Sequence, residues 1–296
     1  MAKRNAAGRS ASSPFRVAPL PPGITGDPGL FGPGSLYWQV NRERVLVLGT
    51  PAIALLQVAH PLVAAAVAEH TDFARGPIER LRSTLGRTLT VVFGDSEQAG
   101  AAAGRVRSLH AAIHGEVDEG SNAFPAGTPY DATDQDLLLW AHVTVVRGAL
   151  DLFHRFVRPL TPAERERYVQ EAERFGVAFG IRPEVLPKNA FELESRFRSM
   201  VEGGSLEVGA RARRLAEDVL TPPPGSARGT ASLTRAVTAG LLPPAIGREF
   251  GLSWGTREQL TFRALAATSR ATFRIIPKTA RWWPHYWTAR DRVRAI

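Results

Sequence analysis

The stretch that decides the fold reads AIALLQVAHPLVAAAVAEH and covers residues 52–70. It is rich in alanine, leucine and valine, and it carries no formal charge before Glu69. Such a run predicts a buried helix of the protein core. Because Pro61 lacks a backbone N–H donor and disfavours helical geometry at His60, we expect the helix to be interrupted near these two residues.

Helical patterns continue through the rest of the chain. Leu81, Leu85 and Leu89 lie four residues apart, on one face of a helix. The sequence contains no pair of alternating, strand-like runs joined by a hairpin turn. It therefore predicts an all-α fold, with helices over residues 77–93, 97–113, 136–156, 163–179, 190–202, 210–219, 231–241 and 256–273, and a shorter one from about residue 184.

The composition suits one large globular domain. Of the 296 residues, 44% are hydrophobic and 22% are charged, which allows a large core. No internal repeat and no clean linker divides the chain, and the prolines at 222–224 predict a surface loop. We expect a multi-helix single domain at residues 29–275. Residues 1–28 predict a flexible arm, and residues 276–296 form a basic, aromatic tail.

The charge is strongly basic. The formal net charge is +9, from 37 basic and 28 acidic residues, which allows contact with nucleic acid or with an anionic membrane. Neither zinc-finger spacing nor an RNP-type aromatic motif is present, so we expect solvated basic faces and no nucleic-acid partner. Two interpretations stay open for the tail, where Trp282, Trp283 and Trp287 gather: a strap packed over the core, or a peripheral membrane contact.

Residues 45–68 are apolar enough to suggest a membrane span. They contain Gln57, His60 and Pro61, which favour a buried core helix over a span. The basic start of the chain is not followed by the apolar core of a signal peptide. We therefore expect a cytoplasmic protein without a transmembrane span.

The sequence contains no cysteine, which excludes thiolate-ligated haem, iron–sulfur clusters and cysteine zinc sites. Its seven histidines are therefore the obvious metal ligands. His110 and His114 are four residues apart on one predicted helix, so both could face one ion. However, Ala111 stands where a zinc metalloprotease has glutamate, and no glutamate lies three residues before any histidine, as a di-iron bundle requires.

A single imidazole on an apolar helix suits haem, which commonly takes one axial ligand from histidine and needs an apolar pocket. His60, His110 and His142 all meet this condition. Taken one at a time, each is more often a hydrogen-bonded histidine of the core than a ligand. These patterns alone do not choose among the three.

Six short motifs follow one another along the chain. They are LLQVAHPLVAAAVAEH at 55–70, RLRSTL at 80–85 with VFGD at 92–95, VRSLHAAI at 106–113, LLWAH at 138–142, FVRPL at 156–160 and AGLLPP at 239–244. In this order they resemble the family that contains the bacterial rubber oxygenases and the fungal ER-bound oxygenase MpaB. The resemblance covers about residues 29–275.

The resemblance implies a cofactor and its ligands. It implies a globin-like helical core around haem b, an iron cofactor, with dioxygen as co-substrate. Within that core His110 corresponds to the proximal ligand of the iron. His60 and His142 remain further candidates for cofactor binding.

The resemblance also implies candidate catalytic side chains. Arg80 and Thr84 match an Arg-x-x-x-Thr element that lies beside the haem, although each could equally be a solvated helical residue. The family's catalytic carboxylate lies upstream of this arginine, where Glu69 is the nearest acid. The chain departs from the family at Ser83, where rubber oxygenases have a lysine that can ligate the iron, so we expect no lysine-capped resting form. It departs again at Ala52, where many relatives have arginine.

The leading interpretation is an oxidoreductase: a haem-dependent oxygenase that acts with dioxygen on an apolar small molecule, such as an alkene-containing or polyprenoid-like compound. A second interpretation is a helical protein that binds or senses haem without turnover. A third is a helical binding module whose histidines are structural. A haem absorption band separates the first two from the third, and oxygen-dependent product formation separates the first from the second.

Overall fold

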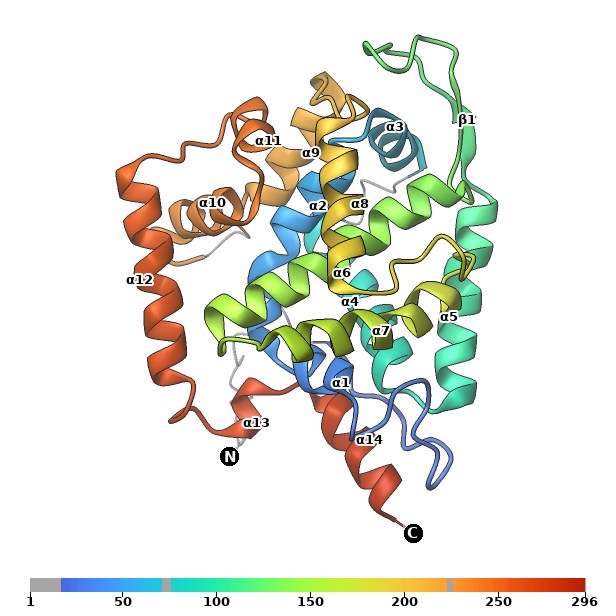
Figure 1. The fold of residues 1–296 in the computed structure, drawn as a ribbon, viewed down its shortest axis with the longest axis vertical. Coiled ribbons are helices and arrows are strands. Elements are labelled where there is room, and N and C mark those ends of the chain that lie inside the picture. The colour runs from blue at the N-terminus through green and yellow to red at the C-terminus, as the bar shows by residue number, and fades with distance from the viewer. Residues whose placement is uncertain (1–16, 71–75, 223–225, 296) are drawn as a thin grey trace, which may run out of the picture.

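The computed structural model describes residues 17–70, 76–222 and 226–295. In these residues the chain forms fourteen α-helices, one short 3-10 helix and one two-stranded hairpin (Figure 1). The predicted all-α fold class is therefore confirmed.

Helix α6, Gln135–Phe156, runs through the centre of the molecule (Figure 1). The side chain of Asp134 caps it by accepting from the backbone N–H groups of Asp136 and Leu137. Twelve residues of α6 are buried, because other helices cover it on several sides. Its neighbours are α2 (Thr50–Val58), α7 (Pro162–Ala178), α8 (Ala190–Glu202), α12 (Thr256–Thr272) and the 3-10 helix η1 (Arg44–Gly49).

The predicted interruption of the first apolar run is confirmed. Helix α2 ends at Val58, and helix α3, Pro61–His70, begins at the proline. The direction of the chain changes by 108° between Arg44–Val58 and Pro61–His70. Pro61 starts α3, a position where a missing N–H costs nothing.

Helices α4, Gly76–Phe93, and α5, Ser96–Ala111, pack together as a hairpin. The turn between them is Gly94–Asp95, and the side chain of Asp95 accepts from the N–H of Gln98 to form a capping box. This cap ends one helix and begins the other within two residues. The turn closes one end of the hairpin, so the start of α4 and the end of α5 are both at the opposite, open end.

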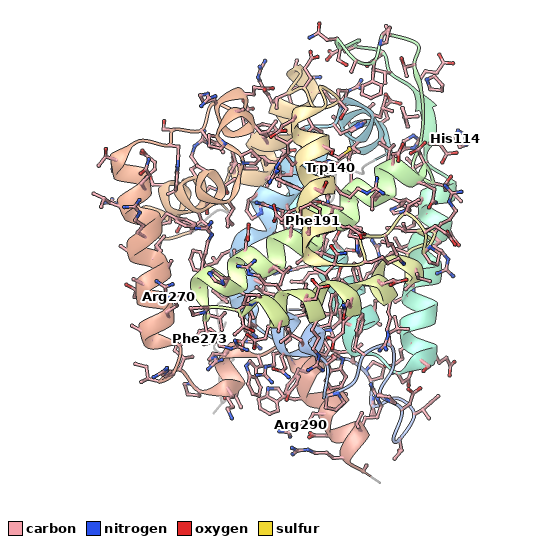
Figure 2. All side chains as sticks on the ribbon, viewed as in Figure 1. His114, Trp140, Phe191, Arg270, Phe273 and Arg290 are labelled. Atoms are coloured by element: carbon pink, nitrogen blue, oxygen red, sulfur yellow. The ribbon has the colours of Figure 1, made fainter. Side chains whose placement is uncertain are left out.

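Two sequence predictions are wrong near the end of α5. Helix α5 ends at Ala111, so His114 does not share it with His110; His114 instead begins strand β1, His114–Glu116. This strand pairs antiparallel with β2, Pro129–Asp131, whereas the sequence predicted no paired strands. The strands have only three residues each, too few to show the alternating pattern that predicts a strand. Figure 2 labels His114 at the right-hand edge of the molecule, where strand β1 begins.

The predicted helix near residue 184 is also wrong. Residues 183–186 form a turn and a bend, and the N–H of Val185 donates to the carbonyl of Arg182 at 3.2 Å. Pro183 and Pro187 frame this segment, and each removes a backbone donor that a helix would need.

The remaining helices surround this centre. Helix α9 packs on α2 and α3, and α10 packs on α2 and α12. Their bounds are α1 (Leu36–Asn41), α9 (Ala210–Leu220), α10 (Thr230–Leu241), α11 (Pro244–Glu249), α13 (Lys278–Arg281) and α14 (Pro284–Arg294).

The chain before α1 and helix α14 meet at the closed end of the α4–α5 hairpin. The N–H of Ile24 donates to Asp95 Oδ2 at 2.7 Å, and the N–H of Gly26 donates to the carbonyl of Arg292 at 3.0 Å. The first part of the predicted flexible arm, residues 1–16, lies outside the described residues. From residue 17 onward these hydrogen bonds hold part of the arm against the helices.

The aromatic tail packs inward. Trp282 and Trp283 are both buried. The indole N–H of Trp282 donates to Glu43 Oε1 at 2.9 Å, and the backbone N–H of Trp283 donates to the carbonyl of Arg42 at 3.0 Å. These two rings therefore cover the core, as expected of a strap, and they are not presented to a membrane surface.

Helix α6 is long and apolar enough to cross a membrane, although 67% of its most apolar window is buried within the protein. Residues 44–70 contain the apolar segment 45–68 that suggested a membrane span in the sequence. They are long and apolar enough to cross a membrane only if the bent α2–α3 pair counts as one span. Buried core helices pass the same test, so these two segments give weak grounds for a membrane span.

Candidate functional site

The open end of the α4–α5 hairpin carries two of the predicted site residues on α4 and one on α5. A helix rises about 1.5 Å per residue. Arg80 lies about as far before the Gly94–Asp95 turn as His110 lies after it, so the two positions are level in an antiparallel pair. Thr84 lies about one turn of α4 closer to the closed end. The fold therefore brings these three positions to the same end of one helix pair.

His110 lies on the inner face of α5. Ala99, Ala102 and Ala103 are buried on that face, and His110 continues it to the last turn, where its side chain is half-buried. Burial lowers the pKa of the His110 imidazole below its usual value. The ring is therefore neutral near pH 7, and the neutral ring is the form that binds a metal. No described residue forms a hydrogen bond with this ring.

The Arg-x-x-x-Thr element lies on the first turns of α4. Thr84 is exposed, so its hydroxyl is free of the packed core. Arg80 is one turn earlier in the helix, and its side chain lies outside the described residues. The structure thus gives the helix positions of the pair, and any contact of Arg80 with a cofactor remains a prediction.

Glu69 belongs to a polar network at the end of α3. The hydroxyl of Tyr130 donates to Glu69 Oε2 at 2.5 Å, and Arg211 Nη1 lies 3.5 Å from Glu69 Oε1. Arg211 also pairs with Asp118. His70 Nε2 lies 3.1 Å from the same hydroxyl of Tyr130. The exposed carboxylate is therefore held in place by contacts from β2 and α9 at the end of α3.

Tyr130 keeps its proton throughout the neutral range. Burial, with the hydrogen bond to Glu69 and the negative charge of that carboxylate, raises the pKa of Tyr130 to about 12. The phenol therefore acts as a hydrogen-bond donor that orients Glu69. Only residues 71–75 separate this network from the start of α4, which places Glu69 close along the chain to the open end of the hairpin.

His60 is buried where α2 meets α3. Its side chain is 4% exposed, and its ring centroid lies 5.0 Å from that of Phe124. Burial lowers the pKa of His60 to about 4, with Asp134 opposing the shift. Its Nδ1 atom has no hydrogen-bond partner within the described residues.

His142 is buried between α6 and α7. Its side chain is 6% exposed, burial lowers its pKa to about 4, and its Nδ1 atom also lacks a partner in the described chain. A methyl group placed on Gly176 would lie 3.1 Å from His142 Cε1 and 2.6 Å from Leu186 Cδ2. Helix α7 therefore fills the space on that side of the imidazole ring.

Among the described residues, no three His, Asp or Glu side chains gather as a metal site. The two histidines also do not share one helix face, as their spacing allowed, because His114 lies on β1.

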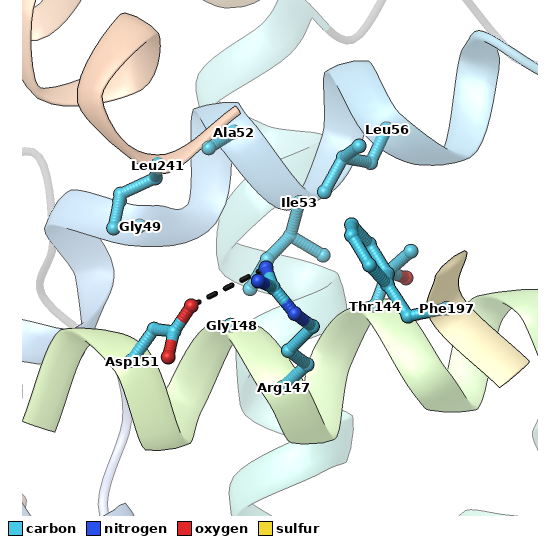
Figure 3. A pocket seen from close by; sticks show the side chains of 10 residues that line it. All are labelled: Gly49, Ala52, Ile53, Leu56, Thr144, Arg147, Gly148, Asp151, Phe197 and Leu241. Atoms are coloured by element: carbon cyan, nitrogen blue, oxygen red, sulfur yellow. Dashed lines mark ion pairs between the residues drawn. The ribbon is translucent and has the colours of Figure 1, made fainter. Parts of the chain in front are cut away.

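A hollow of about 310 Å³ opens between α6, α8 and the α10–α11 junction. Arg147 lines this hollow and also a narrow pocket that Gly49, Ile53 and Leu56 share (Figure 3). Its guanidinium lies 3.3 Å from Asp151 and 2.9 Å from Glu194, and it stacks 4.0 Å above the ring of Phe197. Because two carboxylates already satisfy Arg147, the narrow pocket offers no open anion site. None of the predicted site residues lines this hollow.

The model of one protein family, described as ER-bound oxygenase mpaB/B'/Rubber oxygenase, catalytic domain, matches residues 37–271. The chain belongs to this family of oxygenase catalytic domains. The match begins in α1 and ends in α12, so it includes the α4–α5 hairpin and the network around Glu69. No curated protein and no solved structure matches the chain significantly.

The family resemblance found in the sequence is therefore confirmed, but the partners of Glu69 were missed. Tyr130 and Arg211 are distant from Glu69 in sequence, by 61 residues in the case of Tyr130. No spacing rule connects them, since the contact exists only because the β1–β2 hairpin and α9 pack on α3. The one local signal was a lone tyrosine in a polar loop.

Proposed function

We propose that this chain is an oxygenase that binds haem b through His110 and uses dioxygen to oxidise an apolar substrate. The observation that carries the proposal is the position of His110. In a member of an oxygenase family, it is a half-buried, neutral imidazole without a partner among the described residues, at the open end of a helix pair.

The donor set suits haem. Haem brings four nitrogen ligands of its own, so the protein needs to supply only one axial imidazole. His110 meets this need, because its ring is uncharged and partly accessible. The absence of cysteine leaves histidine as the natural axial ligand of this chain. Bound haem would supply the redox chemistry with dioxygen, which no side chain of the protein can perform.

The other side chains at this end have separate proposed roles. Arg80 would form charge-assisted hydrogen bonds with a haem propionate or orient the co-substrate, and the hydroxyl of Thr84 would donate one hydrogen bond nearby. Glu69, oriented by Tyr130 and Arg211, would accept a proton from the substrate. His60 remains a candidate second cofactor contact, because it is buried with an unpaired ring nitrogen.

The substrate class proposed is an apolar molecule, such as an alkene-containing or polyprenoid-like compound. The support is the family description, which includes rubber oxygenase. An apolar cluster of Ala65, Val117 and Tyr130 lies beside Glu69 and could contact such a substrate.

The test is a spectrum followed by an activity measurement. Protein produced with an ample supply of haem should show a Soret band, and acid–acetone should extract the haem because the chain has no Cys-x-x-Cys-His attachment motif. Oxygen uptake with a panel of apolar alkenes should exceed that of haem-free protein. A colourless protein after haem reconstitution would contradict the proposal. A haem protein without oxygen uptake on any substrate would favour a carrier or sensor instead.

A further inference from the structure

The last quarter of the chain contains a long segment with charges of one sign. Residues 259–290 include six Lys and Arg residues and no Asp or Glu. Two of the six are paired, Arg281 with Glu43 and Arg290 with Asp291. The other four make no ion pair within the described residues, and they are Arg263, Arg270, Arg274 and Lys278.

Helix α12 presents one side to solvent. It stands at the left edge of the molecule in Figure 1, and Figure 2 labels Arg270 and Phe273 near its end. Phe262, Ala266 and Phe273 are buried on its inner side. Because a helix turns by about 100° per residue, the opposite side carries Leu260, Ala264, Ala267 and Ala271, all of which are exposed; Ile275, also exposed, follows in the turn after α12 ends at Thr272.

This outer side combines apolar and basic groups. Leu260 is 59% exposed and Ile275 is 78% exposed, and Ile276 follows at the turn after the helix. Arg263, Arg270 and Arg274 are exposed along one flank of the apolar stripe. We call this surface, from Leu260 to Lys278, the α12 face. An apolar stripe bordered by unpaired cations is the pattern of helices that lie in a membrane interface.

We propose that the α12 face binds the surface of an anionic lipid bilayer. The unpaired cations match the charge of acidic headgroups, and the isoleucine pair can enter the boundary with the acyl chains. A nucleic acid would use the same cations but would gain nothing from exposed aliphatic side chains. The surface differs from the aromatic part of the tail, since Trp282 and Trp283 are buried. The proposal is independent of the haem site.

The experiment measures co-sedimentation of the full chain with vesicles of neutral phosphatidylcholine and with vesicles that contain one anionic lipid in four. We expect binding to the anionic vesicles, weakened by added salt, and little binding to the neutral ones. The variant Arg270→Gln/Arg274→Gln should bind anionic vesicles about 25-fold more weakly, because each basic residue near the surface contributes roughly fivefold. Ile275→Ser/Ile276→Ser should bind several-fold more weakly.

The matched control separates a specific face from the general charge of +9. Arg182 and Arg196 are also exposed, and neither belongs to the α12 face. The control variant Arg182→Gln/Arg196→Gln should keep its affinity within about twofold. All replaced side chains are exposed, so circular dichroism should be unchanged.

Three results would overturn the proposal. The first is an equal loss of affinity in the two arginine pairs, which would show that overall charge alone drives binding. The second is an absence of binding to anionic vesicles by the unaltered chain. The third is a larger loss of affinity of Arg270→Gln/Arg274→Gln for a short DNA duplex than for vesicles, which would assign the face to nucleic acid.

Discussion

His142 and His110 occupy opposite kinds of environment, although both lie on apolar helices next to small residues. His142 is enclosed between α6 and α7, with Leu186 and Gly176 against it. His110 lies at the last turn of α5, half-buried and without a partner in the described residues. An imidazole in a filled interface is part of the packing, whereas the half-buried His110 ring still has both ring nitrogens without a partner in the described residues. Burial alone therefore does not mark the cofactor site.

Burial of histidines should make the stability of the protein depend strongly on pH. Burial lowers the pKa values of His60, His142 and His285 to about 4 in the folded chain. The unfolded chain, with ordinary pKa values near 6.5, takes up these protons first as pH falls. The free energy of unfolding is therefore highest above pH 6.5 and should fall between pH 6.5 and 4, by up to about 1.4 kcal/mol per pH unit for each histidine.

Urea unfolding of the haem-free protein at pH 6.5, 6.0 and 5.5 measures this slope. His142→Leu removes one of the histidines whose pKa is lowered to about 4, so the slope should become smaller. His114→Leu is the matched control, because His114 is exposed, and it should keep the full slope. If His142→Leu left the slope unchanged, His142 would not be held neutral by burial.

The packing against His142 can be tested without touching the histidine. Gly176→Ala places a methyl group 2.6 Å from Leu186 Cδ2 and 3.1 Å from His142 Cε1. Such overpacking should cost about 2 kcal/mol of unfolding free energy, while the haem content of the folded protein should stay unchanged. Gly100→Ala on α5 is the control, because its methyl group would meet nothing within 4 Å. A loss of haem in Gly176→Ala would move the cofactor site toward α6 and α7.

Arg80 and Thr84 test the open end of the hairpin. Arg80→Ala and Thr84→Ala should each keep substantial haem yet lower turnover by about tenfold, which corresponds to ~1.4 kcal/mol of transition-state stabilisation. Thr84→Ala should leave the unfolding free energy within about 0.5 kcal/mol, since Thr84 is an exposed helix position and such positions contribute little to it. Haem content and oxygen uptake measured side by side decide the result. A loss of haem in Arg80→Ala with full activity per haem would make Arg80 an anchor only.

Local chemistry in the sequence predicted most of the fold. The break at Pro61 and the bounds of α6, α7, α8 and α12 depend on proline, capping residues and apolar periodicity, which act within a few residues. The β1–β2 hairpin was missed because strands of three residues carry no pattern. Helix α14 was missed because its burial depends on contact with α4, which is far from it in the sequence.

The candidate site was less predictable. The sequence, with its family resemblance, selected His110, Arg80, Thr84 and Glu69, and the level positions of His110 and Arg80 follow from a hairpin with a two-residue turn. It paired His110 with His114 by spacing alone, and the early end of α5 breaks that pair. The partners of Glu69 come from β2 and α9, and such contacts are a property of tertiary packing only.

The most direct test of the account is the haem content of two variants prepared in parallel, His110→Ala and His142→Ala. Purified proteins are reconstituted with equimolar haem, separated from free haem by gel filtration, and compared by the ratio of Soret to protein absorbance. His110→Ala should retain less than about one tenth of the haem of the unaltered chain, because it loses the axial ligand. His142→Ala should be less stable, since it leaves a cavity between α6 and α7, but its folded fraction should bind haem as the unaltered chain does. The reverse result, with full haem in His110→Ala and none in folded His142→Ala, would contradict the account.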